Sequence, residues 1–318
     1  MNNYNNPFIY SDDNKRYHSW NYYLKHKYNH KVFKVALNTN FGCPNRDGTC
    51  GVGGCIFCSS LGSGDCAGNI KDDLNTQFNE GKAIMLNKWP KGIAMAYFQA
   101  FSNTYAPLST LHECFDQFID REDCIGLCIA TRADCLDDKK IAYLDSLTTK
   151  KEVWIELGLQ SIYDTTAELT NRGHNYEQFK DMVYKLSKTN LKICVHLMNS
   201  LPNETAEMMI NSAYTVGQLP IHAIKIHMLH ILKNTKISDM YLNNEFKLQT
   251  IEEYIDTIVK QLEVIPNNII IQRLTGDGIK DLLIAPLWTI KKTIVLNNID
   301  KLLLKRNSYQ GISLPYKK

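Results

Sequence analysis

Six apolar segments, each followed by a stretch with the spacing of a helix, restrict the fold of this 318-residue chain more than any other feature. The segments read VFKVALN, IAMAYFQAF, CIGLCIATR, VWIELGLQS, LKICVHLMNS and AIKIHMLHI. Near-continuous apolar strands that alternate with helices are typical of a parallel sheet covered by helices. Because no Gly-x-Gly-x-x-Gly motif accompanies them, they favour a barrel over a dinucleotide-binding fold. The sequence therefore predicts an α/β fold, a partial (βα)6 TIM-type barrel with parallel strands.

The barrel prediction divides the chain into three parts. Residues 1–31 form a basic and aromatic segment, residues 32–235 hold the barrel, and residues 236–318 read as a C-terminal α/β extension that closes its open side. The extension is expected to hold an amphipathic helix at residues 250–263, followed by a short strand that ends in Arg273 and Asp277. A long helix is expected at residues 289–305.

The loop at residues 38–65, after the first strand, is rich in glycine and cysteine. It contains seven glycines and four cysteines, Cys43, Cys50, Cys55 and Cys58. Glycine lets a backbone fold tightly around an object, and thiolates are soft ligands. A loop of this composition is typical of a metal or iron–sulfur site.

Two metal sites compete for this loop. Structural zinc sites usually have two close cysteine pairs, but here only Cys55 and Cys58 form such a pair. The alternative is a [4Fe–4S] cluster held by Cys43, Cys55 and Cys58, which leaves one iron open for another ligand. The spacing favours the cluster. Disulfides are less expected, because no signal peptide precedes the loop and cytosolic thiols stay reduced.

Hydropathy argues against a membrane-spanning helix, whereas the net charge leaves the class of binding partner open. No apolar run reaches the roughly 18 residues of a membrane helix, so we expect a cytoplasmic protein without a membrane partner. The net charge of +3 permits an acidic partner such as RNA. Residues 15–31 interleave cations with aromatic side chains, as in an RNA-binding patch. The same pattern fits a helix whose aromatic residues pack on the barrel, and we favour that interpretation.

The motifs C-P-N-R-D-G-T and G-x-G-G-C-x-F-C resemble the cluster loop of a bacterial radical S-adenosylmethionine family, the YhcC/YtqA type. This family is related to the radical domain of the elongator catalytic subunit. The segments Q-R-L-T-G-D, A-P-L-W and a final Q-G extend the likeness from about Tyr22 to Gly311. The resemblance implies that Cys43, Cys55 and Cys58 are the cluster ligands, and that Cys50 and Cys66 are bystanders.

The resemblance also implies the cofactors, a [4Fe–4S] cluster and S-adenosylmethionine. In such enzymes the open iron chelates the amino and carboxylate groups of S-adenosylmethionine. One electron then yields a 5′-deoxyadenosyl radical, which takes a hydrogen atom from the substrate. An unidentified low-potential electron donor must supply that electron.

Polar residues at the strand ends are the candidates for binding S-adenosylmethionine, because the C-terminal ends of barrel strands form the active site. The methionine amino group is assigned to Gln99, Ser102 and Asn103. The methionine carboxylate is assigned to Arg132, and the ribose to Glu156 and Gln160. Arg172 is assigned to the carboxylate or to the substrate. The side chains assigned to adenine or substrate are His196, Lys225 and His227.

Each candidate also has a structural interpretation. His196 could be a core residue, and Glu156, which is costly to bury alone, could be the ion-pair partner of Arg132. At Asn199, Ser200 and Asn203, the resemblance leads us to expect glycines.

The resemblance further implies a tRNA substrate. Elongator relatives act on the wobble uridine, and the YtqA-type branch is expected to convert carboxymethylaminomethyluridine to aminomethyluridine, with the N-terminal segment as the RNA contact. One alternative is a radical enzyme that acts on a small metabolite or a protein side chain. Another is a zinc-stabilised RNA-binding protein without catalysis.

Overall fold

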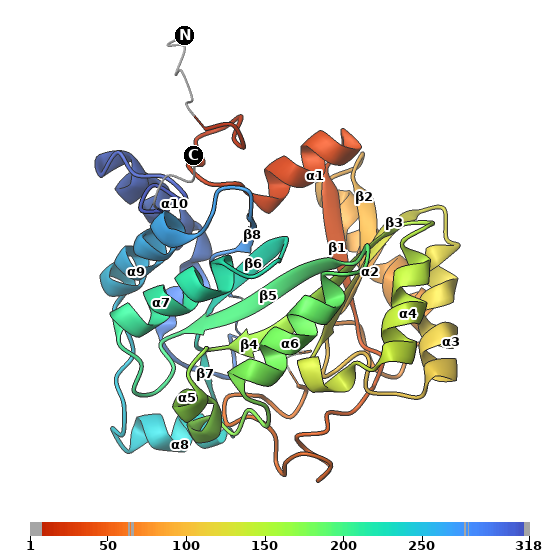
Figure 1. Ribbon diagram of the computed structural model, residues 1–318, viewed down its shortest axis with the longest axis horizontal. Helices are drawn as coiled ribbons and strands as arrows, with labels where there is room; N and C mark the ends of the chain where they lie inside the picture. The colour runs from red at the N-terminus through yellow and green to blue at the C-terminus, as the bar shows by residue number, and fades with distance from the viewer. Residues whose placement is uncertain (1–7, 63, 65–66, 277, 279, 315–318) are drawn as a thin grey trace.

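Seven strands form one parallel sheet, curled into a partial barrel, in the computed structural model, which describes residues 8–62, 64, 67–276, 278 and 280–314. The sheet order is β1-β2-β3-β4-β5-β6-β8 (Figure 1). The strands are β1 (Val32–Leu37), β2 (Ile93–Phe98), β3 (Cys124–Thr131), β4 (Glu152–Gln160), β5 (Lys192–Asn199), β6 (Ala223–Met228) and β8 (Ile270–Arg273). The predicted α/β fold and partial parallel barrel are confirmed, and each of the six predicted segments forms one strand.

The sheet has one strand more than predicted. The seventh strand, β8, comes from the predicted C-terminal extension and pairs in parallel with β6. Between these two strands the chain forms one short strand and two helices, so the strand–helix alternation that marks the first six units is broken. This short strand forms an antiparallel ribbon with a strand that follows β8. The ribbon consists of β7 (Ile231–Leu232) and β9 (Leu283–Ala285). The predicted Asp277 lies outside the described residues.

The helices follow the predicted pattern closely. They are α1 (Trp20–Tyr28), α2 (Leu74–Lys88), α3 (Leu108–Ile119), α4 (Asp138–Leu147), α5 (Asp164–Leu169), α6 (Tyr176–Leu186), α7 (Ala206–Gly217), α8 (Lys236–Leu242), α9 (Ile251–Val264) and α10 (Lys292–Lys305), with short 3-10 turns η1 (Ala133–Cys135) and η2 (Leu287–Lys291). The start of α9 is fixed by a capping box between Thr250 and Glu253. The long C-terminal helix begins later than predicted, because η2 precedes it. In the described part of the chain, no helix is long and apolar enough to cross a bilayer.

The two faces of the sheet have different roles. Alternate side chains such as Phe33, Val35 and Leu37 of β1 point outward into the main apolar core beneath the helices. Residues of the opposite face point into the barrel, where the N-terminal ends of the strands form a smaller core around Trp154. Nearer the C-terminal ends, the interior becomes polar. The barrel is therefore filled with apolar side chains at one end and lined with polar side chains at the other.

Helix α1 packs against the apolar end. Its Leu24 is buried in the smaller core, and the ring of Trp20 meets that of Trp154 edge-on with centroids 4.9 Å apart. Figure 1 shows α1 at the end of the sheet opposite to α5, α8 and the cysteine loop. Helix α1 thus packs on the barrel, as the favoured interpretation of residues 15–31 expected, and an RNA contact at this segment stays a prediction.

We predict that Phe115→Ala will lower the free energy of unfolding by about 3–5 kcal/mol, the usual cost of a large aromatic cavity. Phe115 of α3 is fully buried, and its ring lies 4.8 Å from that of Phe98 on β2. Urea unfolding followed by circular dichroism measures the change. The control, Ile84→Ala on α2, removes a side chain that is 69% exposed and should change stability by less than about 0.5 kcal/mol. Equal losses in both variants would contradict this account of the core.

Candidate active site

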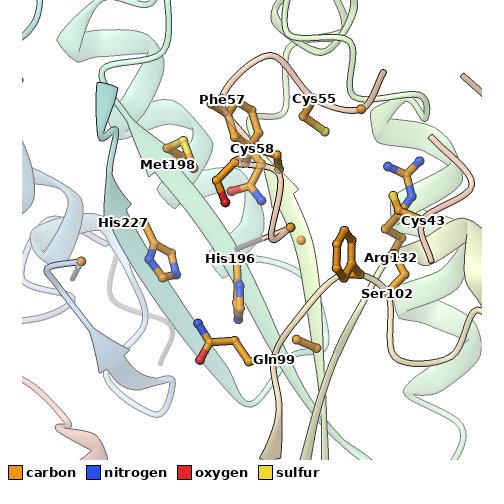
Figure 2. A pocket seen from close by; sticks show the side chains of 18 of the residues that line it. Cys43, Cys55, Phe57, Cys58, Gln99, Ser102, Arg132, His196, Met198 and His227 are labelled. Atoms are coloured by element: carbon orange, nitrogen blue, oxygen red, sulfur yellow. The ribbon is translucent and has the colours of Figure 1, made fainter. Parts of the chain in front are cut away.

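A pocket opens at the C-terminal ends of the strands, between the cysteine loop and the polar half of the barrel interior (Figure 2). The pocket is lined by all the predicted site residues except Asn103 and Lys225, namely by Cys43, Cys55, Cys58, Gln99, Ser102, Arg132, Glu156, Gln160, Arg172, His196 and His227. The fold therefore brings together side chains that are far apart in the sequence, as expected for strand ends of a parallel barrel.

Cys55 has the surroundings of a thiolate. Its sulfur is buried and lies 3.6 Å from both Asn45 Nδ2 and Arg172 Nη1. A hydrogen bond from the Cys58 thiol, together with the Arg172 and Arg132 guanidinium groups, holds the pKa of Cys55 well below that of an ordinary thiol, against the effect of burial. A thiolate is the form that ligates iron, so the loop presents at least one sulfur ready for a metal.

The cysteine loop is held in place by a segment far along the chain. Thr170 accepts a backbone hydrogen bond from Ile56 at 3.1 Å, and Asn171 Nδ2 donates to the carbonyls of Val52 at 3.1 Å and Gly54 at 2.8 Å. On the other side, Ile237 of α8 donates to the Ile56 carbonyl at 3.1 Å. The conformation of the loop is thus fixed by hydrogen bonds from the segment after α5 and from α8.

The residues present fit an iron–sulfur cluster. Cys43, Cys55 and Cys58 all face one pocket, and Figure 2 shows them along its upper and right-hand wall. A cube takes each thiolate on a different iron, so its ligands surround it rather than converge on a point. Among the described residues, no three His, Cys, Asp or Glu side chains converge closely enough to hold one metal ion. All described cysteines are free, and Cys66 lies outside the described residues.

Side chains next to the cysteines fit S-adenosylmethionine. Arg172 Nε and Gln160 Oε1 are buried without a hydrogen-bond partner among the described residues, and both side chains line the pocket. Buried polar atoms of this kind call for a ligand that pairs with them, such as a carboxylate or a hydroxyl group. A Cβ at Gly158 would lie 2.9 Å from Arg172 Nη2, so glycine lets the guanidinium lie against β4.

Arg132 is already paired within the protein. Its Nε and Nη2 donate to the two carboxylate oxygens of Asp134 at 2.8 and 2.6 Å, and its Nη1 donates to the Arg172 carbonyl at 2.8 Å. The guanidinium therefore positions Arg172 and lies beside Cys50, whose sulfur is 3.6 Å from Nη2. Since Asp134 is its partner, the structural interpretation that paired Arg132 with Glu156 is wrong.

Asn103 lies outside the pocket. Its Nδ2 donates to the carbonyls of Phe98, Ala100 and Ala130 at 2.9–3.0 Å, and its Oδ1 accepts a hydrogen bond from Thr39. The amide thus joins the ends of β2 and β3 and shapes the turn that carries Ser102.

Glu156 is the centre of a buried charge cluster inside the barrel. Lys34 Nζ lies 2.6 Å from Oε1, and Oε2 pairs with Lys225 and with His196 Nε2, the latter at 3.1 Å. Burial alone would raise the pKa of Glu156, but the Lys225 and Lys34 ammonium groups and the His196 hydrogen bond hold it well below its usual range. Both oxygens are paired with protein groups, so Glu156 lines the pocket as an anion that is already neutralised within the protein.

Several lining residues were missed from the sequence. Tyr97 and Met198 lie two residues from Gln99 and His196 on the same strands, so the two-residue period places them on the same face. Arg46 and Arg273 also line the pocket. No short-range signal marks Asn45, whose contact with Cys55 depends on the folded loop.

The exit of β5 keeps the backbone shape that the missing glycines would have allowed. Ser200 and Asn203 have φ values of 70° and 65°, in the left-handed region that favours glycine. The backbone therefore follows a glycine-like path there, although the side chains are larger. Asn199 turns away and exchanges hydrogen bonds of 2.8 and 2.9 Å with Gln261 of α9.

We predict that Glu156→Gln will destabilise the fold in a pH-dependent manner. Removing one partner of a buried ion cluster costs about 3–5 kcal/mol at neutral pH. Because the folded-state pKa of Glu156 is depressed, its contribution is present above the unfolded-state value of roughly 4.3 and is lost as the pH falls below it. Unfolding free energies of both proteins between pH 7 and acid should therefore converge at low pH. A difference that grows as the pH falls would contradict this ionisation.

Comparisons with known proteins agree with the geometry. The sequence pattern of the Radical SAM superfamily matches residues 37–213, and that of the Radical SAM C-terminal domain matches residues 221–305. YtqA of Bacillus subtilis is 47% identical, covering 96% of this chain and 95% of that protein. YhcC of Escherichia coli is 32% identical, covering 92% of this chain and 93% of that protein.

A more distant group of relatives carries the name of an activity. The tRNA uridine(34) acetyltransferase of Methanocaldococcus infernus is 28% identical over 59% of this chain but only 34% of its own length. Among solved structures, Elp3 from the same archaeon aligns with a TM-score of 0.63 at 20% identity, covering 88% of this chain and 64% of that one. This likeness shows a shared fold.

Both matched regions lie within the barrel and its C-terminal part, and the cysteine loop and the C-terminal ends of β1 to β5 fall inside the first of them. The superfamily uses an iron–sulfur cluster and S-adenosylmethionine, which the pocket can accommodate. The chain therefore belongs to the radical S-adenosylmethionine superfamily, as an enzyme of the YtqA/YhcC type whose cofactors are a [4Fe–4S] cluster and S-adenosylmethionine.

Proposed function

We propose that the enzyme modifies the wobble uridine of tRNA, converting carboxymethylaminomethyluridine to aminomethyluridine. The observation that carries the proposal is the similarity to a tRNA uridine(34) acetyltransferase, which spans 192 residues of alignment. An unpaired base in a loop can enter a pocket at small cost in stacking energy. The carbon between the amine and the carboxylate is a suitable radical target, because both neighbours delocalise the radical.

The mouth of the pocket supports an RNA substrate better than the N-terminal segment does. The guanidinium of Arg46 lies 5.3 Å from the centroid of the Phe101 ring, and both residues line the pocket. A planar cation on an aromatic ring offers a surface on which a base can stack. Lys236, at the start of α8, lies against the cysteine loop near Gly53. These cations support the proposal, because they could pair with the phosphates of an anticodon loop.

The cofactors, when bound, supply a 5′-deoxyadenosyl radical, and the side chains of this enzyme supply the binding groups. We assign the cluster to Cys43, Cys55 and Cys58. Arg172 and Gln160 then bind polar groups of S-adenosylmethionine through the buried atoms that lack protein partners. Residues near the cluster also exclude water, since Phe57 is buried beside Cys58.

We predict that a strain lacking the gene will accumulate carboxymethylaminomethyluridine in its tRNA and lose aminomethyluridine. Mass spectrometry of digested tRNA measures both nucleosides. Reconstituted enzyme should then convert tRNA from that strain anaerobically, with release of 5′-deoxyadenosine. An unchanged nucleoside profile would contradict the proposal. Release of 5′-deoxyadenosine that ignores tRNA, together with tRNA binding that does not weaken with salt, would indicate a small metabolite or protein substrate.

We predict that Cys43→Ala, Cys55→Ala and Cys58→Ala will each prevent stable assembly of the cluster. Iron content and visible absorption after anaerobic reconstitution measure the loss. Cys50→Ala is the matched control from the same loop, because the Cys50 sulfur contacts Arg132 and Asp134 and the residue is not among those that line the pocket. Full iron content in any of the first three variants, or loss of iron in the control, would overturn the ligand assignment.

A further inference from the structure

Two histidines lie in the pocket, and the binding of S-adenosylmethionine by Arg172 and Gln160 proposed above uses neither of them. His196 of β5 and His227 of β6 both line the pocket, with ring centroids 5.2 Å apart. Figure 2 shows them on the side of the pocket away from Cys43 and Arg132. They therefore lie on a different side of the pocket from Cys43 and from the Arg132 guanidinium.

The charge cluster fixes the tautomer of His196. The ionised Glu156 can only accept hydrogen bonds, so the His196 Nε2 that lies 3.1 Å from its Oε2 must carry a hydrogen. Burial and the Lys225 charge lower the pKa of His196 to about 4, so the ring is neutral near pH 7 and Nδ1 keeps its lone pair. Lys34 and Lys225 hold Glu156 from two other strands. His196 thus presents a fixed hydrogen-bond acceptor to the pocket.

His227 presents the complementary group. Its Nε2 is buried and has no hydrogen-bond partner among the described residues. The charge cluster behind it contains two ammonium groups, Lys34 and Lys225, but a single carboxylate, Glu156, so these three residues carry a net positive charge. Arg273 also lines this part of the pocket. We assign the hydrogen of the neutral His227 ring to Nε2, and a buried N–H near net positive charge favours a negatively charged acceptor such as a carboxylate.

We propose that His196 and His227 together bind the amino-acid-like end of the substrate, with His196 Nδ1 accepting a hydrogen bond from its amine and His227 Nε2–H donating one to its carboxylate. The inference rests on the proposed function, in which the carboxymethylaminomethyl group carries both an amine and a carboxylate on one carbon. Binding at both ends orients this carbon inside the pocket that the cysteines share. Lys34, Glu156 and Lys225 are then positioning residues, which act through His196.

Matched variants separate recognition from folding. His196→Gln keeps an N–H for Glu156 but removes the ring acceptor, and His227→Phe keeps the ring but removes the N–H donor. Each should raise the KM for tRNA from the deletion strain by about 10- to 100-fold, the usual effect of losing a hydrogen bond to a charged group. His227→Gln retains a donor and should stay within about threefold of the wild type, a small part of that effect. Iron content and the Kd of S-adenosylmethionine should be unchanged.

A second measurement does not depend on tRNA turnover. N-methylglycine carries the same secondary amine and carboxylate, and its binding to the holoenzyme with S-adenosylmethionine can be followed by saturation-transfer NMR. The signal should be present in the wild type and lost in His196→Gln and His227→Phe. If tRNA is not converted but this pattern holds, the proposed function fails and the inference stands. Unchanged KM values and unchanged N-methylglycine binding would overturn the inference, as would an equal loss of affinity for S-adenosylmethionine.

Discussion

The contact between one carboxylate and two ammonium groups inside the barrel is the constraint on which the site depends. Lys34, Glu156 and Lys225 belong to β1, β4 and β6, which are not neighbours in the sheet. These contacts cross the interior of the curled sheet, so they specify how far the sheet bends as well as its strand order. A buried ion cluster contributes little net stability compared with apolar packing, but each of its members is costly to leave alone. The sheet curvature that brings Lys34, Glu156 and Lys225 together also shapes the inner end of the pocket.

The cysteine loop depends on a second long-range constraint. Its backbone is bound by Thr170 and Asn171 on one side and by Ile237 on the other, while Arg172, the next residue, reaches the Cys55 sulfur. One short segment after α5 therefore both anchors the loop and adjusts the ionisation of a cysteine in it. Arg132 orders this segment in turn, because it binds the Arg172 carbonyl and is itself held by Asp134. The cysteine loop and Arg172, which is assigned to S-adenosylmethionine, are consequently joined by one network of hydrogen bonds.

The fold could be predicted because strand and helix periods are local properties of a sequence. The polar strand ends could be predicted for the same reason, since the C-terminal ends of parallel strands meet. The residues that form ion pairs with one another could not be predicted. Asp134 lies two residues from Arg132 and forms its ion pair in a turn, whereas Glu156 finds partners 122 and 69 residues away. Tyr97 was not among the predicted site residues, although its two-residue spacing from Gln99 places it on the pocket face. A short strand ending at Arg273 was predicted, but its pairing with β6 was not, because its four residues do not reveal which sheet they join.

The junction of the two matched sequence regions lies inside the sheet. The first region ends at residue 213 and the second begins at residue 221, so β6 and β8 belong to the second region by sequence but to the barrel by hydrogen bonding. A protein shortened at this junction would lose Lys225 from the charge cluster and expose the backbone edge of β5. Exposed edges of this kind recruit strands from other molecules and cause aggregation. The second region is therefore needed to complete both the barrel sheet and its buried charge cluster.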